Sequence, residues 1–308
     1  MNSNLTSLEE LVACARKHPP EFWLFRGHKT TKYLPTPKAH RPDTFPNAGN
    51  KPGCGDEAWI CQAFRDKAHS VYARCPADDH YFEWLALMRH HLAPTRLLDW
   101  SRNILVAAYF AVEPDRENPK DRKSDRQIWA LNATALTDFA RDEHVSAAKT
   151  TKSPLFCGCL AHQKNTDGNQ AKRWSVGRAA ETLAKQAVID ERAWPDHQCT
   201  AEHCCRFPLA IAPPRTFPRM VSQASWFTVH PKPSKVSLSL EQINKEHKDR
   251  SGKPLWEHFV IPATAKDQIL DDLAAVGVSR ATLYPDLDGL AQSLLPDYGR
   301  LCSQLVRK

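Results

Sequence analysis

The sequence predicts an α+β fold with a mainly antiparallel sheet and flanking helices. Apolar segments typical of strands lie at residues 21–27, 126–132 and 254–262, and amphipathic segments typical of helices lie between and beyond them. Because strands and helices are mixed without a regular strand–helix–strand alternation, we do not expect a parallel, doubly wound sheet. The chain also lacks G-x-G-x-x-G and P-loop motifs, so a dinucleotide would not be held in the Rossmann manner.

The N-terminal segment predicts a short helix and then a strand. A capping box, Thr6 to Glu9 or Ser7 to Glu10, opens the helix, and two consecutive prolines end it. The strand that follows, EFWLFRG, is apolar until it ends in an arginine and a glycine. A loop rich in proline, glycine and asparagine comes next.

Helices dominate the next part of the chain. Helical periodicity at residues 56–74 and 80–91 predicts two amphipathic helices. Residues 93–103, APTRLLDWSRN, are interpreted as a turn-rich connection. The segment 104–113 is almost wholly apolar, and its alanines favour a buried helix over a strand.

Composition divides the chain into three parts. Residues 1–139 and 207–308 carry the expected strands and helices, whereas residues 140–206 are polar, rich in lysine and alanine, and predict a helical or irregular insertion. In the last part, residues 220–231 predict one strand or a pair of strands. Residues 264–278 predict an amphipathic helix that ends at a glycine, before a last short helix.

The balance of charge is mildly basic. Lys and Arg number 42 against 35 Asp and Glu, which gives a net charge of +7 and a pI near 8.9. Such a balance is compatible with a polyanionic partner, either nucleic acid or a dinucleotide. No apolar stretch approaches the ~20 residues that span a bilayer, and the N-terminus lacks the apolar core of a signal peptide. We therefore expect a cytoplasmic protein without membrane contact.

The ten cysteines predict thiols or metal ligands rather than disulfides in such a protein. Five of them gather in the insertion near two histidines: Cys157, Cys159, Cys199, Cys204, Cys205, His162 and His203. A zinc site there is one interpretation. Scattered buried thiols are the other, because no pair has the C-x2-C spacing of a zinc ribbon or finger.

Four stretches together make the sequence similar to the FRG-domain family. They are WLFRG, which ends in Arg26-Gly27; HHLAPTRLLDWSRNILVAAYFA, residues 90–111; RMVSQASWFTVH, residues 219–230; and the C-terminal FVIP and ATLYPDLDGLA. The chain departs from the family pattern at three places. Arg89 stands where the family usually has glutamine, Leu92 where it has glycine, and Ala224-Ser225 where it has x-Gly after Gln223. The arginine in place of glutamine is expected to alter ligand contacts.

The order of these motifs resembles that of ADP-ribosyltransferases. This resemblance implies a split antiparallel sheet and NAD as the substrate. In those enzymes a strand-end arginine grips the phosphate or ribose of NAD, a Ser/Thr motif orients nicotinamide and ribose, and a late carboxylate supports an oxocarbenium-like state. The resemblance places these roles on Arg26, on Thr95 or Ser101, and on Gln223. Gly27 would let the backbone approach the ligand.

The late carboxylate is missing from this scheme, because the amide of Gln223 carries no negative charge. Another acid must therefore supply it if the protein is catalytic. Glu83 and Asp99 are the candidates. Glu83 lies seven residues before His90 on a predicted helix, so the two share a face, and His90 is a candidate general acid or ligand contact.

Three further residues are predicted to contact the cofactor, each with a structural alternative. His28 flanks the strand end at Arg26 and would hold phosphate, or it lies exposed on the surface. Arg96 would bind the ligand, or it pairs with Asp99 and braces the turn. Trp100 would stack on nicotinamide or adenine, or it belongs to the core.

The resemblance implies an enzyme that transfers ADP-ribose from NAD to a macromolecule, protein or nucleic acid, or that hydrolyses NAD. It also implies a bacterial toxin or anti-phage defence effector, with an antitoxin or immunity protein as a further partner. A non-catalytic nucleotide- or nucleic-acid-binding module is the alternative, since the chain is basic and lacks the late carboxylate. A metal-dependent hydrolase that uses the His, Cys and Asp residues is a third interpretation.

Overall fold

The structure is a computed structural model. It describes residues 4–32, 34–41, 43–44, 54–78, 81–114, 123–139, 208–212, 217–230 and 239–294. The predicted insertion at residues 140–206, with its five cysteines and two histidines, lies outside these residues.

The expected α+β class is confirmed by helices packed around a six-stranded antiparallel sheet. The strand order is β4-β5-β2-β1-β3-β6. The strands are β1 (Trp23–His28), β2 (Leu97–Ser101), β3 (Arg126–Asn132), β4 (Leu209–Ile211), β5 (Ser225–Val229) and β6 (Trp256–Ile261). Apolar and aromatic residues fill most of these strands, as the pleated and largely buried surface requires.

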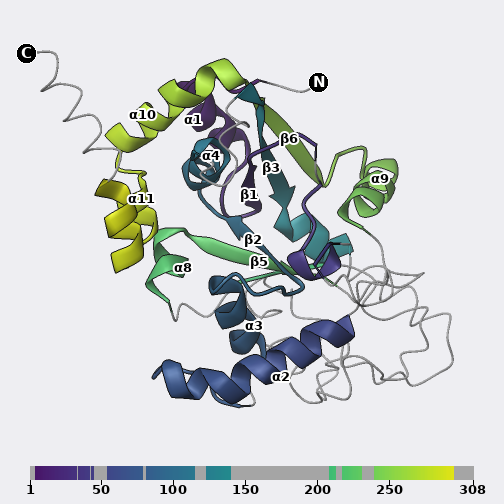
Figure 1. Ribbon diagram of the computed structural model, residues 1–308. Coiled ribbons are helices and arrows are strands. Elements are labelled where there is room, and N and C mark those ends of the chain that lie inside the picture. The colour runs from purple at the N-terminus through teal and green to yellow at the C-terminus, as the bar shows by residue number, and fades with distance from the viewer. Residues whose placement is uncertain are drawn as a thin grey trace, which may run out of the picture.

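The sheet consists of two halves that meet at a single residue pair. In one half β1 pairs with β3 along all six of its residues, and in the other β2 pairs with β5 along all five of its residues. Between the halves, β1 and β2 pair only at Phe25 and Ser101. Figure 1 shows β2 and β5 running at a wide angle to β1, β3 and β6. The strands on either side of the junction therefore diverge just beyond Phe25.

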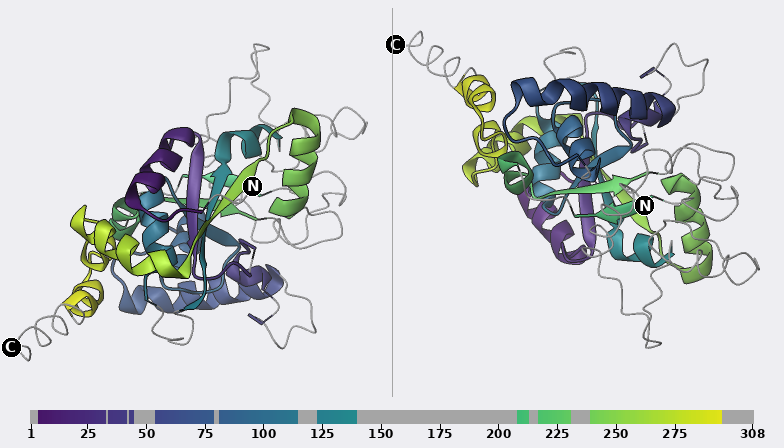
Figure 2. Two further views of the ribbon diagram at one scale, coloured as in Figure 1. Left: turned by 90° about the horizontal axis from the view of Figure 1, so that it is seen from above. Right: turned by 90° about the horizontal axis from the view of Figure 1, so that it is seen from below.

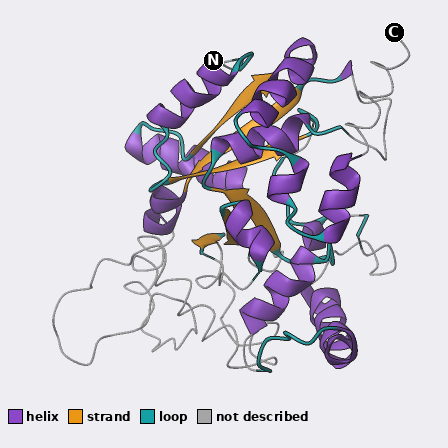
Figure 3. Ribbon diagram, turned by 90° about the vertical axis from the view of Figure 1, so that its left-hand side faces the viewer, coloured by secondary structure: helices purple, strands orange, loops and turns teal. Residues whose placement is uncertain are grey.

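Helices cover both halves. They are α1 (Leu8–Lys17), α2 (Cys54–Val71), α3 (Tyr81–His90), α4 (Ile104–Val112), α8 (Pro218–Ser222), α9 (Leu240–Ser251), α10 (Lys266–Ala275) and α11 (Arg280–Leu283). The strands lie between α1 and α9, as the view from above shows (Figure 2). From the side of α8 and α11, helices stand in front of the strands (Figure 3). In the described part of the chain, no helix has the length and apolar character to cross a membrane.

Three apolar clusters form the core. The first packs α1, α4 and α10 against β1, β3 and β6, and it includes Phe25 and Ile128. The second packs α2, α3 and α8 against β2 and β5, and it includes Leu97 and Phe227. The third lies against α9 and joins strand residues of both halves. The junction of the sheet thus separates the first two clusters, which leaves room for a pocket between them.

The N-terminal helices form as their sequences predict. Ser7 caps α1, because its hydroxyl accepts from the backbone nitrogen of Glu10 at 3.3 Å, while the Glu10 carboxylate accepts from the backbone nitrogen of Thr6 at 2.6 Å. The capping box is therefore centred on Ser7 rather than Thr6. Asn103 caps α4 by accepting from the backbone nitrogen of Leu105 at 2.9 Å, and the wholly apolar α4 is buried along most of its length.

Two local predictions were wrong. Residues 93–103 are not only a turn, since Leu97–Ser101 form β2, whose aspartate is held by full pairing with β5 rather than by strand propensity. Residues 220–231 do not form strand throughout, because Pro218–Ser222 form α8 and only Ser225–Val229 form β5. The short β4 and the helix α9, with its capping box at Ser239, were not predicted.

Candidate functional site

A pocket of about 280 Å³ lies at the junction of the two sheet halves. Its floor consists of strand residues next to the Phe25–Ser101 pair, and its walls come from α3, α4, α8 and the segment after α11. The lining residues with polar or charged groups are Arg26, Arg89, His90, Asp99, Trp100, Ser101, Arg219, Gln223, Ser225 and Tyr284. The pocket thus gathers residues from six separate stretches of the sequence.

Arg26 bridges the two strands where they diverge. Its Nη1 donates to the backbone oxygen of Asp99 on β2 at 2.6 Å, and its Nε donates to Nε2 of His28 at 3.1 Å. The acceptor role at Nε2 places the proton of a neutral His28 ring on Nδ1. The guanidinium is therefore fixed in orientation at the mouth of the junction, with 15% of the side chain exposed. His28 supports Arg26 and does not itself line the pocket.

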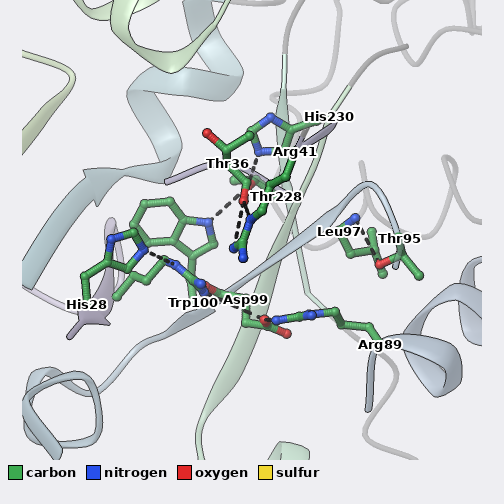
Figure 4. Close-up of polar contacts among 11 residues, drawn as sticks. His28, Thr36, Arg41, Arg89, Thr95, Leu97, Asp99, Trp100, Thr228 and His230 are labelled. Atoms are coloured by element: carbon green, nitrogen blue, oxygen red, sulfur yellow. Dashed lines mark hydrogen bonds and ion pairs between the residues drawn. The ribbon is translucent and has the colours of Figure 1, made fainter. Parts of the chain in front are cut away.

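Asp99 is the carboxylate of the pocket, and two arginines share it. Arg89, at the C-terminal end of α3, donates from Nε to Oδ2 of Asp99 at 2.7 Å and also from Nη2 to the same oxygen. Nη1 of Arg26 lies 3.7 Å from that oxygen. The Arg89 guanidinium points directly at Asp99 in the close-up view (Figure 4). The Asp99 side chain is still 39% exposed, so a ligand can reach it.

These contacts fix the charges of the pocket at neutral pH. Burial opposes ionisation of Asp99, but the positive charges of Arg89 and Arg26 outweigh it and hold the pKa of Asp99 below its usual range. The pKa of Arg26 is lowered to about 10, chiefly by burial and then by the like charges of Arg89 and Arg41, while the charge of Asp99 opposes the shift. Both side chains are therefore ionised at pH 7. Three arginines around one carboxylate leave an excess of positive charge.

Gly27 contacts helix α4 rather than open space. A Cβ atom at this position would lie 2.0 Å from the backbone oxygen of Ala107 and 2.6 Å from the backbone nitrogen of Ala111. Helix α4 thus touches the backbone of β1, and no larger residue leaves room for that contact. The glycine was predicted for its closeness to a ligand; in the structure its missing side chain serves helix packing at the pocket floor.

Ser101 and Gln223 join β2 to the turn after α8. The Ser101 hydroxyl donates to the backbone oxygen of Gln223 at 2.7 Å and accepts from the backbone nitrogen of Asn103 at 3.0 Å. The amide nitrogen of Gln223 donates to the backbone oxygen of Leu283 at 3.0 Å. Both residues line the pocket, and both hydrogen-bond to backbone groups that hold its wall in place.

His90 forms an apolar part of the wall. Its ring stacks on Phe217 with the centroids 5.3 Å apart. Burial, followed by the positive charge of Arg219, lowers the pKa of His90 to about 4. The imidazole is therefore neutral at pH 7, which suits a hydrogen-bond acceptor or a stacking surface better than the predicted general acid.

Trp100 is held from behind the pocket. The indole is buried, and its Nε1 donates to the hydroxyl of Thr228 at 3.0 Å. That hydroxyl in turn lies 2.9 Å from Nε2 of His230 (Figure 4). Burial lowers the pKa of His230 well below its usual value, so this ring is neutral. Trp100 is thus a core residue, as one interpretation of the sequence had it: its ring packs in the third apolar cluster, while the residue also borders the pocket.

Three predicted residues lie away from the pocket. Arg96 is 1% exposed and forms an ion pair with the fully buried Glu57 of α2 at 2.5 Å, so its alternative pairing with Asp99 was wrong. Thr95 is fully buried, and its hydroxyl accepts from the backbone nitrogen of Leu97 at 3.3 Å. Glu83 lies at the first turn of α3, whereas the pocket is lined by the last turn of that helix.

Several pocket residues were not predicted, among them Arg89 and Tyr284. Arg89 stands where the FRG-domain family usually has glutamine, and this difference was the feature of the sequence that pointed to a ligand contact at this position. Tyr284 follows α11, and its ring lies between the guanidinium groups of Arg219 and Arg280, 4.7 and 4.6 Å from the ring centroid. Tyr284 belongs to the C-terminal stretch ATLYPDLDGLA, but only the tertiary fold brings this segment beside Phe110 of α4.

The described residues include no group of three His, Cys, Asp or Glu side chains that could hold a metal ion. The arrangement at the junction instead matches an anion. Guanidinium groups bind phosphate and carboxylate oxygens through charge-assisted hydrogen bonds.

Comparison with known proteins identifies one family in the chain. Residues 21–121 match the family model of the FRG domain. The match spans β1 through α4, and so contains Arg26, Arg89 and Asp99 but not Gln223. No curated protein and no solved structure shows significant similarity to the chain.

Proposed function

The chain carries an FRG domain, and we propose that the pocket of this domain binds NAD and cleaves its nicotinamide–ribose bond. The ADP-ribose would pass to a macromolecular acceptor, or to water. The observation that carries the proposal is the position of Arg26 at the junction of the two sheet halves, beside the ionised carboxylate of Asp99.

The chemistry of the reaction requires both kinds of charge. Departure of nicotinamide builds positive charge on the ribose, which a fixed carboxylate stabilises. The pyrophosphate of NAD needs cationic donors, which guanidinium groups supply in pairs. Asp99 and the arginines Arg26 and Arg89 provide these groups within one pocket. Asp99 thereby takes the part that the neutral Gln223 cannot take.

The size of the pocket limits what it encloses. Ligand pockets measure ~300–1,000 Å³, so a volume of about 280 Å³ holds one half of a dinucleotide. The nicotinamide riboside half would lie over Asp99 and Ser101. The adenosine half would extend from the arginines toward the protein surface, where an acceptor approaches.

A separate observation favours a second candidate function, the binding of a nucleotide without catalysis. The amide of Gln223 is engaged by the backbone oxygen of Leu283, and Asp99 is engaged by two arginines. If Asp99 stays paired with these arginines when a ligand is present, the same pocket would bind a nucleotide without consuming it. A non-catalytic nucleotide- or nucleic-acid-binding module follows from that arrangement.

Nicotinamide release tests the enzymatic proposal. The wild-type protein is incubated with NAD alone, with nucleic acid, and with cell lysate, beside Arg26→Ala, Asp99→Asn and the control Arg16→Gln, which removes one charge from the exposed surface of α1. We expect release by the wild type and Arg16→Gln, and rates about a hundredfold lower in the two pocket variants. Release no faster than that of Arg26→Ala under all three conditions overturns the proposal. Saturable NAD binding without release supports the second candidate.

The cellular role follows from the same chemistry. Depletion of NAD or modification of an essential macromolecule in the cytoplasm stops growth, so the protein would act as a toxin or anti-phage effector controlled by an antitoxin or immunity protein. Growth of bacteria that express the wild-type protein is compared with growth of bacteria that express the Arg26→Ala variant. Equal growth with equal expression of the two proteins argues against this role.

A further inference from the structure

The carboxylate of Asp99 stands where an anionic ligand would bind. Its Oδ2 accepts hydrogen bonds from Nε and Nη2 of Arg89 and lies 3.7 Å from Nη1 of Arg26. These donors match the forked arrangement that binds one phosphate oxygen or a carboxylate. Asp99 therefore acts as an internal counter-ion for both arginines.

One carboxylate does not neutralise this site. Arg26 and Arg89 together carry two positive charges against one negative charge, and Arg41 is close enough that its charge lowers the pKa of Arg26. A ligand with two negative charges, such as a pyrophosphate, satisfies the arginines better than Asp99 does. Because Arg89 extends from the end of α3 on a flexible side chain that is 17% exposed, its guanidinium can change partner without movement of the backbone.

We infer that Arg89 is the specificity-determining residue for the pyrophosphate of the ligand, and that it exchanges Asp99 for phosphate when the ligand binds. The inference rests on the proposed function, since it assigns the pyrophosphate of NAD to this contact. The exchange also releases Asp99 from its ion pair, so the carboxylate faces the ribose only in the bound state. Without a ligand, Asp99 thus stays in its ion pair with Arg89 until a phosphorylated ligand binds.

This competition predicts opposite effects from the two partners. Arg89→Gln removes phosphate donors, so it weakens binding of phosphorylated ligands by about tenfold or more. Asp99→Asn removes the competing carboxylate, so it tightens binding of a ligand that contacts only the arginines. A merely structural ion pair would instead lose affinity in both variants, because either substitution would loosen the same wall.

Calorimetric titration with three probes measures these effects. Inorganic pyrophosphate reports the phosphate contact alone, ADP-ribose adds the nucleoside parts, and adenosine lacks phosphate. We expect Arg89→Gln to weaken the binding of pyrophosphate and of ADP-ribose about tenfold or more and to leave the binding of adenosine unchanged. Asp99→Asn is expected to tighten the binding of pyrophosphate. Arg16→Gln changes the net charge by the same amount as Arg89→Gln, and it is expected to bind all three probes as the wild type does. Urea unfolding of each variant verifies that it is folded at the temperature of the titration.

The outcomes separate this inference from the proposed function. Pyrophosphate binding that is unchanged in Arg89→Gln, or weakened in Asp99→Asn, overturns the exchange even if the wild type releases nicotinamide. A wild-type protein that binds no pyrophosphate overturns the exchange as well. Opposite effects of the two variants together with no nicotinamide release support the exchange and refute the enzymatic proposal.

Discussion

Substitution of Gly27 by alanine tests whether this glycine serves helix packing. The added Cβ would lie 2.0 Å from the backbone oxygen of Ala107, whereas ordinary contacts begin at 3.4 Å. Helix α4 would have to retreat by more than about 1 Å, because the three atoms nearest the new methyl group are backbone atoms of Ala107 and Ala111 in this helix. None of them can turn aside as a flexible side chain would.

The magnitude follows from what α4 buries. Seven of its nine residues are buried in the first apolar cluster, so a retreat of this size weakens dispersion contacts along the whole helix. We expect Gly27→Ala to lower the free energy of unfolding by about 3 kcal/mol, the upper end of overpacking effects. Domains are stable by only ~5–15 kcal/mol, so the loss is large.

Urea unfolding followed by tryptophan fluorescence measures the change. Gly252→Ala is the matched control, since Gly252 has φ 71° with no atom within 4 Å of the added Cβ. That variant carries only the cost of the left-handed backbone, about 1 kcal/mol. If Gly27→Ala is no less stable than Gly252→Ala, α4 adapts to the methyl group, and the packing argument is refuted.

Three further predictions concern stability. Glu57→Gln leaves the buried guanidinium of Arg96 without its counter-charge, so we expect a loss of about 3–5 kcal/mol in urea unfolding; a loss below about 1 kcal/mol would contradict a dry ion pair. Leu92 has φ 63° and is 68% exposed, so Leu92→Gly relieves backbone strain and is expected to raise the unfolding free energy by up to about 1 kcal/mol, whereas a loss would show that its side chain matters more. Burial lowers the pKa of His40 and of His90 to about 4 in the folded state, and it lowers the pKa of His230 well below its usual value. These histidines take up protons near pH 6.5 when unfolded, whereas His40 and His90 do so only near pH 4 when folded, so stability falls from pH 6.5 to 4 by up to about 1.4 kcal/mol per pH unit for each of these two. Stability that is flat over this range would refute their burial.

The sequence determined the class of fold and the first part of the site. The strand EFWLFRG that contains Arg26 and the apolar helix α4 after its Asn103 cap could both be predicted. Hydrophobic periodicity and helix capping depend only on residues that are close in the sequence. Glu83 and Asp99 were both named as candidate carboxylates, and of the two only Asp99 lines the pocket. The strand β2 around it was missed, since an aspartate inside a strand is stabilised only by pairing with β5.

Tertiary structure decided which polar residues face the ligand. Arg96 and Asp99 are three residues apart, yet Arg96 pairs with Glu57 of the distant helix α2, and Asp99 pairs with Arg89 of α3. Tyr284 reaches the pocket from a segment almost at the other end of the chain. A side chain's partner depends on which segments the core brings together, and charges act over distances that sequence separation does not measure. Local sequence could therefore predict that Arg26 ends a strand, but only the divergence of β1 and β2 beyond Phe25 places its guanidinium between two sheet halves beside a carboxylate.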